Sequence, residues 1–141
     1  LSKEMAKDGE GASKLLVSKV SGAKTEKDAK GVAKSVVCSS LLKAAMFGSD
    51  ANWGRVLCAI GYSGCDVDIN KVDVSFASKA GKVDVCKNGA GIDFSEELAK
   101  TVLTEDEIDI VVELNDGNGV AEAYGCDLTY EYVKINGDYR S

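Results

Sequence analysis

Histidine and proline are both absent from the 141-residue sequence. Without histidine, the chain cannot by itself supply a Ser-His-Asp triad, a histidine metal ligand or a histidine general base. No apolar run approaches the roughly 18 residues that a membrane-spanning helix needs. Basic residues are also in the minority, with 17 Lys and Arg against 23 Asp and Glu and a net charge of −6. This balance argues against a nucleic-acid partner and against an anionic membrane surface, because both bind positive charge.

Cysteine is present, but not in the pattern of a disulfide framework. The sequence has five cysteines, an odd number, and no Cys-x-x-Cys pair. Secreted disulfide-rich domains usually carry an even number, so we expect reduced thiols and a cytoplasmic location, or the mitochondrial matrix if the source is fungal. Cys58 and Cys65 are predicted to be small core residues rather than ligands. We therefore expect no metal site and no cofactor.

The first 65 residues are rich in helical patterns. Residues 14–20 predict one strand, and apolar residues at helical spacing predict a helix that begins at Thr25. A break is expected at Ser39-Ser40, and two further helical pieces follow over 41–47 and 53–62, the second of them well buried. One strand cannot form a sheet alone. Residues 1–65 are therefore predicted to be a portion of a main sandwich domain whose sheet other polypeptides complete.

From residue 66 the apolar pattern changes to period two. Strands are predicted over 72–76, 83–85, 108–114 and 120–126, and Ser95 is predicted to cap a short helix. Ala80-Gly81 and Asn88-Gly89 are predicted turns, and the glycine-rich residues 115–119 are predicted to form a hairpin loop between the last two strands. Residues 66–126 should form a small α+β lobe, and the tyrosine-rich tail, residues 127–141, should dock back on the body at the active site.

The stretch from Phe47 to Arg55 is predicted to be the junction around which the chain is organised. Gly48 is expected to end the preceding helix in a left-handed conformation, and Asp50 or Asn52 to cap the next one. Trp53, the only tryptophan, is large enough to anchor the corner. The stretch predicts either an ordinary helix–loop–helix corner or a loop packed beside an active site.

Three segments, in the same order, resemble signatures of the ornithine acetyltransferase family, the ArgJ-type glutamate N-acetyltransferases. Residues 47–55 read Phe-Gly-Ser-Asp-Ala-Asn-Trp-Gly-Arg, with alanine where the family has proline. Residues 8–14 read Asp-Gly-Glu-Gly-Ala-Ser-Lys, and residues 134–141 read Lys-Ile-Asn-Gly-Asp-Tyr-Arg-Ser. The resemblance implies an α+β fold, the layered α/β sandwich of the DmpA/ArgJ type, and a chain that is the C-terminal part of the family's β chain.

Taken without the family, the residues offer no complete catalytic set, because no nucleophile–base pair is recognisable. Glu10, in a glycine-framed turn, is the best candidate for a polar site, and Asn136 and Ser141 come next. On these grounds alone, a binding or scaffold lobe is the default prediction.

The resemblance implies a more specific role. The family's nucleophilic threonine and its oxyanion-hole motif are missing here, so no catalytic residue is predicted in this chain, and both groups should come from other polypeptides. The implied substrate-binding residues are Glu10, Asn136 and Ser141, where Ser141 replaces the family's threonine. The implied reaction moves an acetyl group from N-acetylornithine to glutamate through an acetyl-threonine ester. The implied partners are the α chain and the remainder of the β chain, in an α2β2 assembly.

Other interpretations stay open at this point. Acetyl-CoA is possible as a second acetyl donor. The same fold also serves self-processing aminopeptidases with an N-terminal nucleophile, and the acidic, histidine-free composition permits a non-enzymatic interaction lobe. The chain opens on Leu1 rather than methionine, from which we expect a processed or cut polypeptide.

Overall fold

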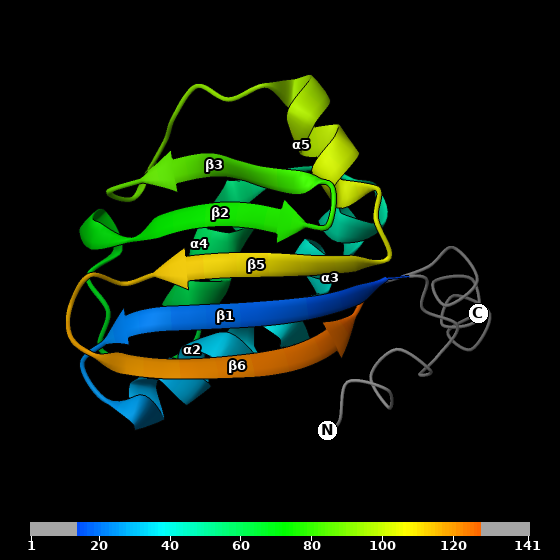
Figure 1. Cartoon of the computed structure of the whole chain (residues 1–141). Helices are drawn as coiled ribbons and strands as arrows, with labels where there is room; N and C mark the ends of the chain where they lie inside the picture. Colours follow the sequence, from blue (N-terminus) through cyan, green and yellow to red (C-terminus); the bar gives the residue numbers. More distant parts are fainter. Residues whose placement is uncertain (1–13, 128–141) are drawn as a thin grey trace, which may run out of the picture.

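The computed structural model describes residues 14–127, which form one mixed six-stranded sheet with helices packed on one face (Figure 1). The strand order is β4-β3-β2-β5-β1-β6. The strands are β1 (Leu15–Ala23), β2 (Asp73–Ser78), β3 (Gly81–Lys87), β4 (Ala90–Gly91), β5 (Glu107–Glu113) and β6 (Gly119–Cys126). The helices are α2 (Glu26–Cys38), α3 (Ser40–Phe47), α4 (Trp53–Gly61) and α5 (Glu96–Leu103), with a short 3-10 turn, η1 (Ile69–Lys71). The predicted α+β class is confirmed.

Strand β1 lies inside the sheet, between two strands from the far end of the sequence. It runs parallel to β5, with Leu15 opposite Glu107, and antiparallel to β6, with Leu15 opposite Cys126. The expectation that this strand adds to the sheet of another polypeptide is therefore wrong. Strands from both predicted segments, 1–65 and 66–126, share one sheet. That other polypeptides complete a larger sandwich stays a prediction.

The loop after β5 does not close a hairpin, which corrects a second prediction. It passes over the end of β1, and Asp116 N–H donates to the carbonyl of Gly22 over 2.7 Å. A β-carbon on Gly117 would lie 2.4 Å from the Ala23 carbonyl oxygen, and one on Gly119 would lie 2.4 Å from that of Thr25. The glycines are therefore explained by this close crossing over another strand rather than by a tight turn.

The β2–β3 hairpin and its neighbour β4 follow the predicted turns. Asn88 and Gly89 have φ values of 51° and 74°. Two successive left-handed residues suit the right-handed twist of the paired strands, and Asn-Gly is a favoured sequence for them. Gly89 N–H also donates to the Val72 carbonyl over 2.8 Å, which ties the turn to the start of β2.

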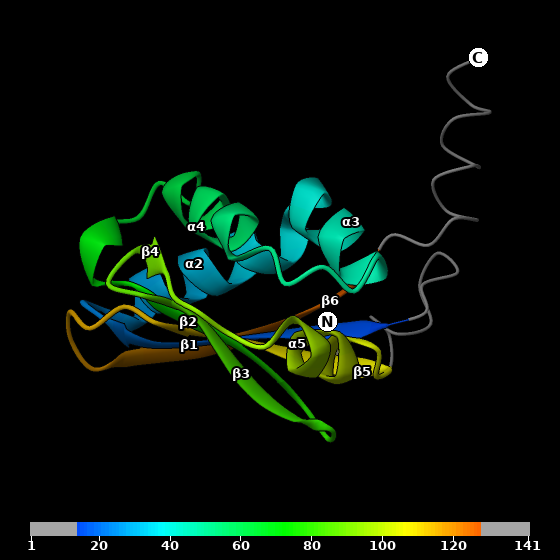
Figure 2. The same ribbon diagram turned by 90° about the horizontal axis from the view of Figure 1, so that it is seen from above.

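Helices α2, α3 and α4 cover one face of the sheet, as the view in Figure 2 shows. Thr25 caps α2, where its Oγ1 accepts a hydrogen bond from Asp28 N–H over 3.0 Å. Ser39 ends α2 and caps α3, since its N–H donates to Val36 and its Oγ accepts from Leu42 N–H. The predicted break is confirmed. The largest side chains of the resulting core are Phe76, Leu16, Leu42, Met46, Ile60, Leu103, Ile108, Ile110 and Leu114.

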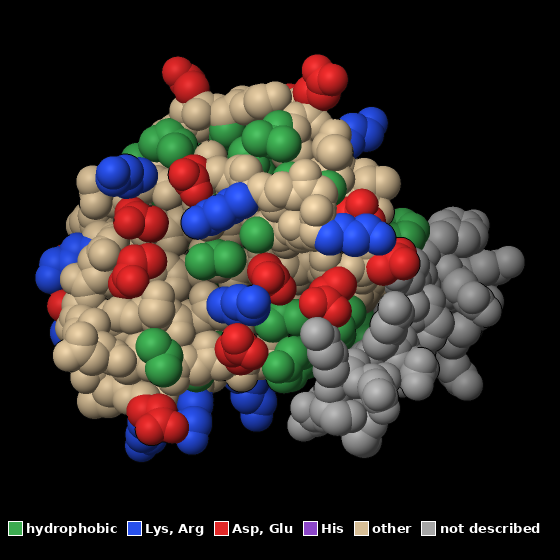
Figure 3. Space-filling model, in the orientation of Figure 1, with side chains coloured by type: hydrophobic (Ala, Val, Ile, Leu, Met, Phe, Trp, Pro, Cys, Tyr) green, Lys and Arg blue, Asp and Glu red, His purple; other side chains and the backbone are tan. Residues whose placement is uncertain are grey.

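The opposite face of the sheet carries a mixture of charged and apolar side chains (Figure 3). Lys19 of β1 pairs there with Asp109 of β5 over 3.0 Å. On the helical side, α4 is less buried than predicted within residues 14–127: Cys58 is exposed, and Tyr62, which follows the helix, is 89% exposed. In this part of the chain no helix is long and apolar enough to cross a membrane.

Candidate functional site

The three predicted substrate-binding residues, Glu10, Asn136 and Ser141, all lie outside the described residues. The structure does show where the segments that carry them join the body. The first segment enters at Lys14 and the second leaves at Asp127. Both points lie at the same end of the sheet, at the start of β1 and the end of β6 (Figure 1).

Lys14 and Asp127 are joined directly by two hydrogen bonds. Lys14 N–H donates to Asp127 Oδ1 over 2.8 Å, and Asp127 N–H donates to the Lys14 carbonyl over 3.2 Å. Their side chains are buried, at 8% and 3% exposure. The pair extends the β1–β6 ladder by one step beyond Leu15 and Cys126. The two motif-bearing segments therefore join the body side by side, although 113 positions separate their junctions in the sequence.

The ammonium group of Lys14 reaches into the layer of helices. Its Nζ donates to the carbonyls of Met46 and Leu103, over 2.6 and 2.8 Å, and to Ser49 Oγ over 2.9 Å. Met46 lies in the last turn of α3, and Leu103 ends α5. Carbonyls at helix C-termini lack partners in their own helix and carry partial negative charge. The three donors of the ammonium thus meet three acceptors.

Burial lowers the pKa of Lys14 below its usual value, because a charged amine loses hydration there, while the negative charge of Asp127 partly opposes this shift. The hydrogen bonds to the helix ends favour the protonated form of Lys14, because a charged donor makes stronger hydrogen bonds than a neutral one. The acceptors that hold the Lys14 amine are two backbone carbonyls and a hydroxyl.

The corner between α3 and α4 contributes to this cluster through Ser49. Its Oγ accepts from Lys14 and donates to the Leu103 carbonyl over 3.3 Å. Ser49, with φ of 54°, is the left-handed residue of the corner, whereas Gly48 has φ of −83°. Gly48 does end α3, as predicted, but the predicted left-handed conformation occurs one residue later. The left-handed turn falls on the residue whose hydroxyl meets Lys14.

The remaining residues of the corner hold its shape. Asn52 caps α4, as predicted, since its Oδ1 accepts from Arg55 N–H over 3.1 Å. Asp50 instead accepts from the Asn52 side-chain amide over 3.2 Å. The Arg55 guanidinium donates to the Leu41 carbonyl over 2.8 Å. The corner is thus a helix–loop–helix junction, and its contact with Lys14 places it beside the point where both segments join the body.

An acidic pocket opens at the same end of the sheet. It is lined by Ser78, Lys79, Glu105, Asp106, Glu107 and Asp109. Two of its carboxylates are engaged, Glu105 by Lys79 over 3.6 Å and Asp109 by Lys19 over 3.0 Å. We do not include this pocket in the candidate site, because none of its lining residues belongs to the three motifs.

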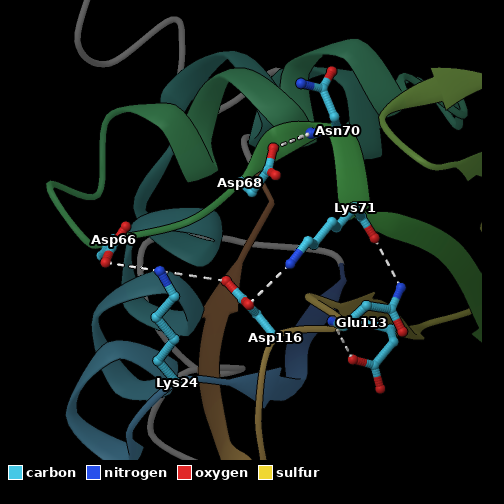
Figure 4. Close-up of polar contacts among 8 residues, drawn as sticks. Lys24, Asp66, Asp68, Asn70, Lys71, Glu113 and Asp116 are labelled. Atoms are coloured by element: carbon cyan, nitrogen blue, oxygen red, sulfur yellow. Dashed lines mark hydrogen bonds and ion pairs between the residues drawn. The ribbon is translucent and has the colours of Figure 1, made fainter.

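A second polar cluster, whose contacts Figure 4 shows, lies at the opposite end of the sheet, where β1 ends at Ala23. Lys24 pairs with Asp66 over 2.8 Å and with Asp116 over 3.5 Å, and Lys71 pairs with Asp116 over 3.1 Å. The hydrogen bond from Lys71 and the charge of Lys24 lower the pKa of Asp116. These contacts join the β1–α2 turn, η1 and the loop that crosses β1, so we assign the cluster to structure. Within residues 14–127, no group of three or more His, Cys, Asp or Glu side chains is arranged so that it could hold a metal ion.

Sequence reasoning missed Lys14, Ser49, Leu103 and Asp127 as parts of one cluster. One signal was available, because Lys14 precedes the apolar run Leu-Leu-Val at the start of a buried strand. A lysine at such a position needs buried acceptors. Its acceptors on α3 and α5 are 32 and 89 positions away, so nothing local identifies them.

Comparison with known proteins agrees with this arrangement. The sheet and its helical layer define an α+β domain. A crystal structure of the arginine biosynthesis bifunctional protein ArgJ from Bacillus halodurans matches the chain with a TM-score of 0.86 and 46% identity, over 97% of this chain and 63% of that one. The model of the ArgJ family matches residues 1–141. The chain belongs to the ArgJ family, and the DmpA/ArgJ-type fold is confirmed.

Curated relatives are similar along the whole chain. The arginine biosynthesis bifunctional protein ArgJ 1 of Clostridium acetobutylicum is 57% identical over 141 residues, which are 100% of this chain and 35% of that protein. The glutamate N-acetyltransferase of Methanopyrus kandleri is 45% identical, over 100% of this chain and 36% of that protein. The chain thus spans about a third of the length of these relatives.

Proposed function

We propose that this chain is the C-terminal portion of an ornithine acetyltransferase, which moves an acetyl group from N-acetylornithine to glutamate in arginine biosynthesis. The observation that carries the proposal is the hydrogen-bonded pair of Lys14 and Asp127, over 2.8 and 3.2 Å. This pair brings together the two points at which the segments that hold Glu10 and the tail residues Asn136 and Ser141 join the body. The names of the relatives, bifunctional ArgJ and glutamate N-acetyltransferase, support the same activity.

The reaction proceeds in two covalent steps. A threonine hydroxyl on another polypeptide attacks the acetyl carbonyl of N-acetylornithine, the C–N bond breaks, and ornithine leaves with a proton on its amine. The amine of glutamate then attacks the acetyl-threonine ester, which regenerates the hydroxyl and forms N-acetylglutamate. An oxyanion hole, also on another polypeptide, stabilises the charge that develops on the carbonyl oxygen in both steps.

This chain supplies binding groups for that reaction. Glu10 pairs with the cationic end of ornithine or orients the ammonium group of the nucleophilic threonine. Asn136 and Ser141 hydrogen-bond the amino-acid part of the substrate, above all its carboxylate. The rest of the protein, about two-thirds of the length of the relatives, provides the α chain and the remainder of the β chain in an α2β2 assembly in the cytoplasm.

The test uses the complete purified protein, mixed with N-acetylornithine and glutamate. We expect equal amounts of ornithine and N-acetylglutamate to form. Release of acetate without N-acetylglutamate would favour a hydrolase such as an aminopeptidase, and no turnover would favour a non-enzymatic module. A parallel reaction with acetyl-CoA and glutamate determines whether acetyl-CoA is also a donor.

Glu10 is tested in the same assay. Replacing a charged partner in a buried site weakens binding by roughly 2–5 kcal/mol, so Glu10→Gln should lower kcat/KM about thirtyfold or more. The assembly should keep its melting temperature, because the change keeps the size of the side chain. Wild-type turnover by Glu10→Gln would contradict the role given to this residue.

A further inference from the structure

Lys14 is a charged residue at a buried position, where an apolar side chain is the more common choice. Among the described residues, Lys14 and Asp127 are the buried charged side chains. Removing a charge from water costs free energy that a well-packed apolar residue would avoid. Lys14 directly follows the segment that holds Glu10. Its ammonium contacts both α3 and α5.

We propose that Lys14 is a positioning residue for the acetyl transfer, an inference that rests on the proposed function. Its ammonium holds the C-terminal ends of α3 and α5 against the start of β1 and thereby fixes where the Glu10 segment leaves the body. Glu10 is four positions before Lys14. Four residues of chain span at most about 14 Å, so the placement of Lys14 restricts the placement of Glu10.

The same contacts connect all three motifs. Lys14 ends the first motif, Ser49 belongs to the second, and Asp127, bonded to the Lys14 backbone, leads into the third. Release of the ammonium would free the two helix ends, the corner and the segment together. The expected consequence is a misplaced Glu10 carboxylate rather than a lost substrate contact by Lys14 itself.

Lys14→Met is the variant that tests this role. Methionine keeps an unbranched side chain of similar length but has no donor, so the carbonyls of Met46 and Leu103 lose the hydrogen bonds from Lys14 and keep those from Ser49. Lys19→Met is the matched control. Lys19 lies on the same strand, but its side chain is 44% exposed and pairs with Asp109 on the open face of the sheet. We expect Lys19→Met to leave kcat/KM within about twofold of wild type, because exposed ion pairs contribute little.

A double-mutant cycle with Glu10→Gln separates positioning from general stability. Because coupled residues show non-additive effects, Lys14→Met should lower kcat/KM about tenfold or more in the wild-type protein and less than about twofold in the Glu10→Gln background. The melting temperature should fall equally in both backgrounds. Equal activity losses in the two backgrounds would overturn the proposal, since they are what a purely structural role predicts.

A Ser49→Ala cycle and the wild-type transfer assay complete the test. If Lys14→Met does not fold, Ser49→Ala replaces it in the cycle, because it removes one acceptor and keeps the ammonium; additive losses again overturn the proposal. If the wild-type protein does not transfer acetyl, the proposed function fails and this inference fails with it. Normal transfer by wild type together with an additive cycle rejects the role of Lys14 alone.

Discussion

Trp53 packs its indole ring directly on the backbone of Gly91. A β-carbon at Gly91 would lie 2.3 Å from Trp53 Cζ2 and 2.7 Å from Cε2. This contact connects the first turn of α4 to the short edge strand β4. The indole is partly exposed, and it holds β4 against the corner.

We expect Gly91→Ala to destabilise the protein by about 1–3 kcal/mol, because an overpacked contact forces ring or backbone to move. Gly61→Ala is the control, since no atom lies within 4 Å of a β-carbon at Gly61. Chemical denaturation of the complete protein measures both. A loss of stability in Gly61→Ala equal to that in Gly91→Ala would contradict the packing argument.

Ser18 provides a second stability test. It is fully buried in β1, and its Oγ has no hydrogen-bond partner among the described residues. A buried polar group without a partner costs roughly 1–3 kcal/mol, so Ser18→Ala should stabilise the fold by about 1 kcal/mol. Ser35→Ala should have the opposite effect, because the Ser35 hydroxyl donates to the Ala59 carbonyl over 2.6 Å. Destabilisation by Ser18→Ala would indicate a partner for this hydroxyl.

The Asp116 cluster predicts a pH dependence of stability. The pKa of Asp116 is lowered in the folded state, chiefly by the hydrogen bond from Lys71. Its contribution is therefore complete above the unfolded pKa of about 3.9 and is lost as the pH falls through the lower folded value. The pKa of Lys24 is raised, chiefly by its hydrogen bond to Asp66, so its contribution is lost only at alkaline pH.

The measurement for this cluster is the difference in unfolding free energy between wild type and Asp116→Asn at several pH values. The difference should be constant near neutral pH and shrink below about pH 3.9. Asp66→Asn should show a smaller difference, because Asp66 is 76% exposed and contacts one lysine rather than two. A difference for Asp116→Asn that does not vary with pH would rule out a lowered carboxyl pKa.

The tail makes a further prediction for the proposed activity. Asn136→Ala should raise the KM for N-acetylornithine without lowering the melting temperature, because the role proposed for Asn136 is a hydrogen bond to the substrate. Asn70→Ala, an exposed asparagine in η1 near the far end of the sheet, should change neither value. A lower melting temperature with an unchanged KM would make Asn136 a structural residue.

The sequence predicted the elements of this fold better than their arrangement. The helix starts at Thr25, Asn52 and Ser95 were predictable, because a cap and the N–H group it binds are a few positions apart. The order of the strands was not predictable, because Leu15 of β1 pairs with Glu107 of β5, which is far away in the sequence. Gly117 and Gly119 indicate a hairpin in the sequence, but they allow the loop after β5 to pass close to the backbone at the end of β1.

The candidate site was predictable only in part, for the same physical reason. The motif residues could be identified directly in the sequence. That their two segments join the body at neighbouring points could not, because it depends on the long-range contact between Lys14 and Asp127. The exposure of Cys58 and Tyr62 was also missed, because an apolar helix pattern does not specify whether the same polypeptide covers it.

The position of β1 also has a consequence for how the chain acquires its structure during synthesis. Ser21 of β1 and Glu113 of β5, whose side chains are in contact, are 92 positions apart. Strand β1 must therefore wait for β5 and β6 to be synthesised, with both of its edges open in the meantime. A chain terminated before residue 107 would lack β5 and β6, so β1 would have neither of its two neighbours in the sheet.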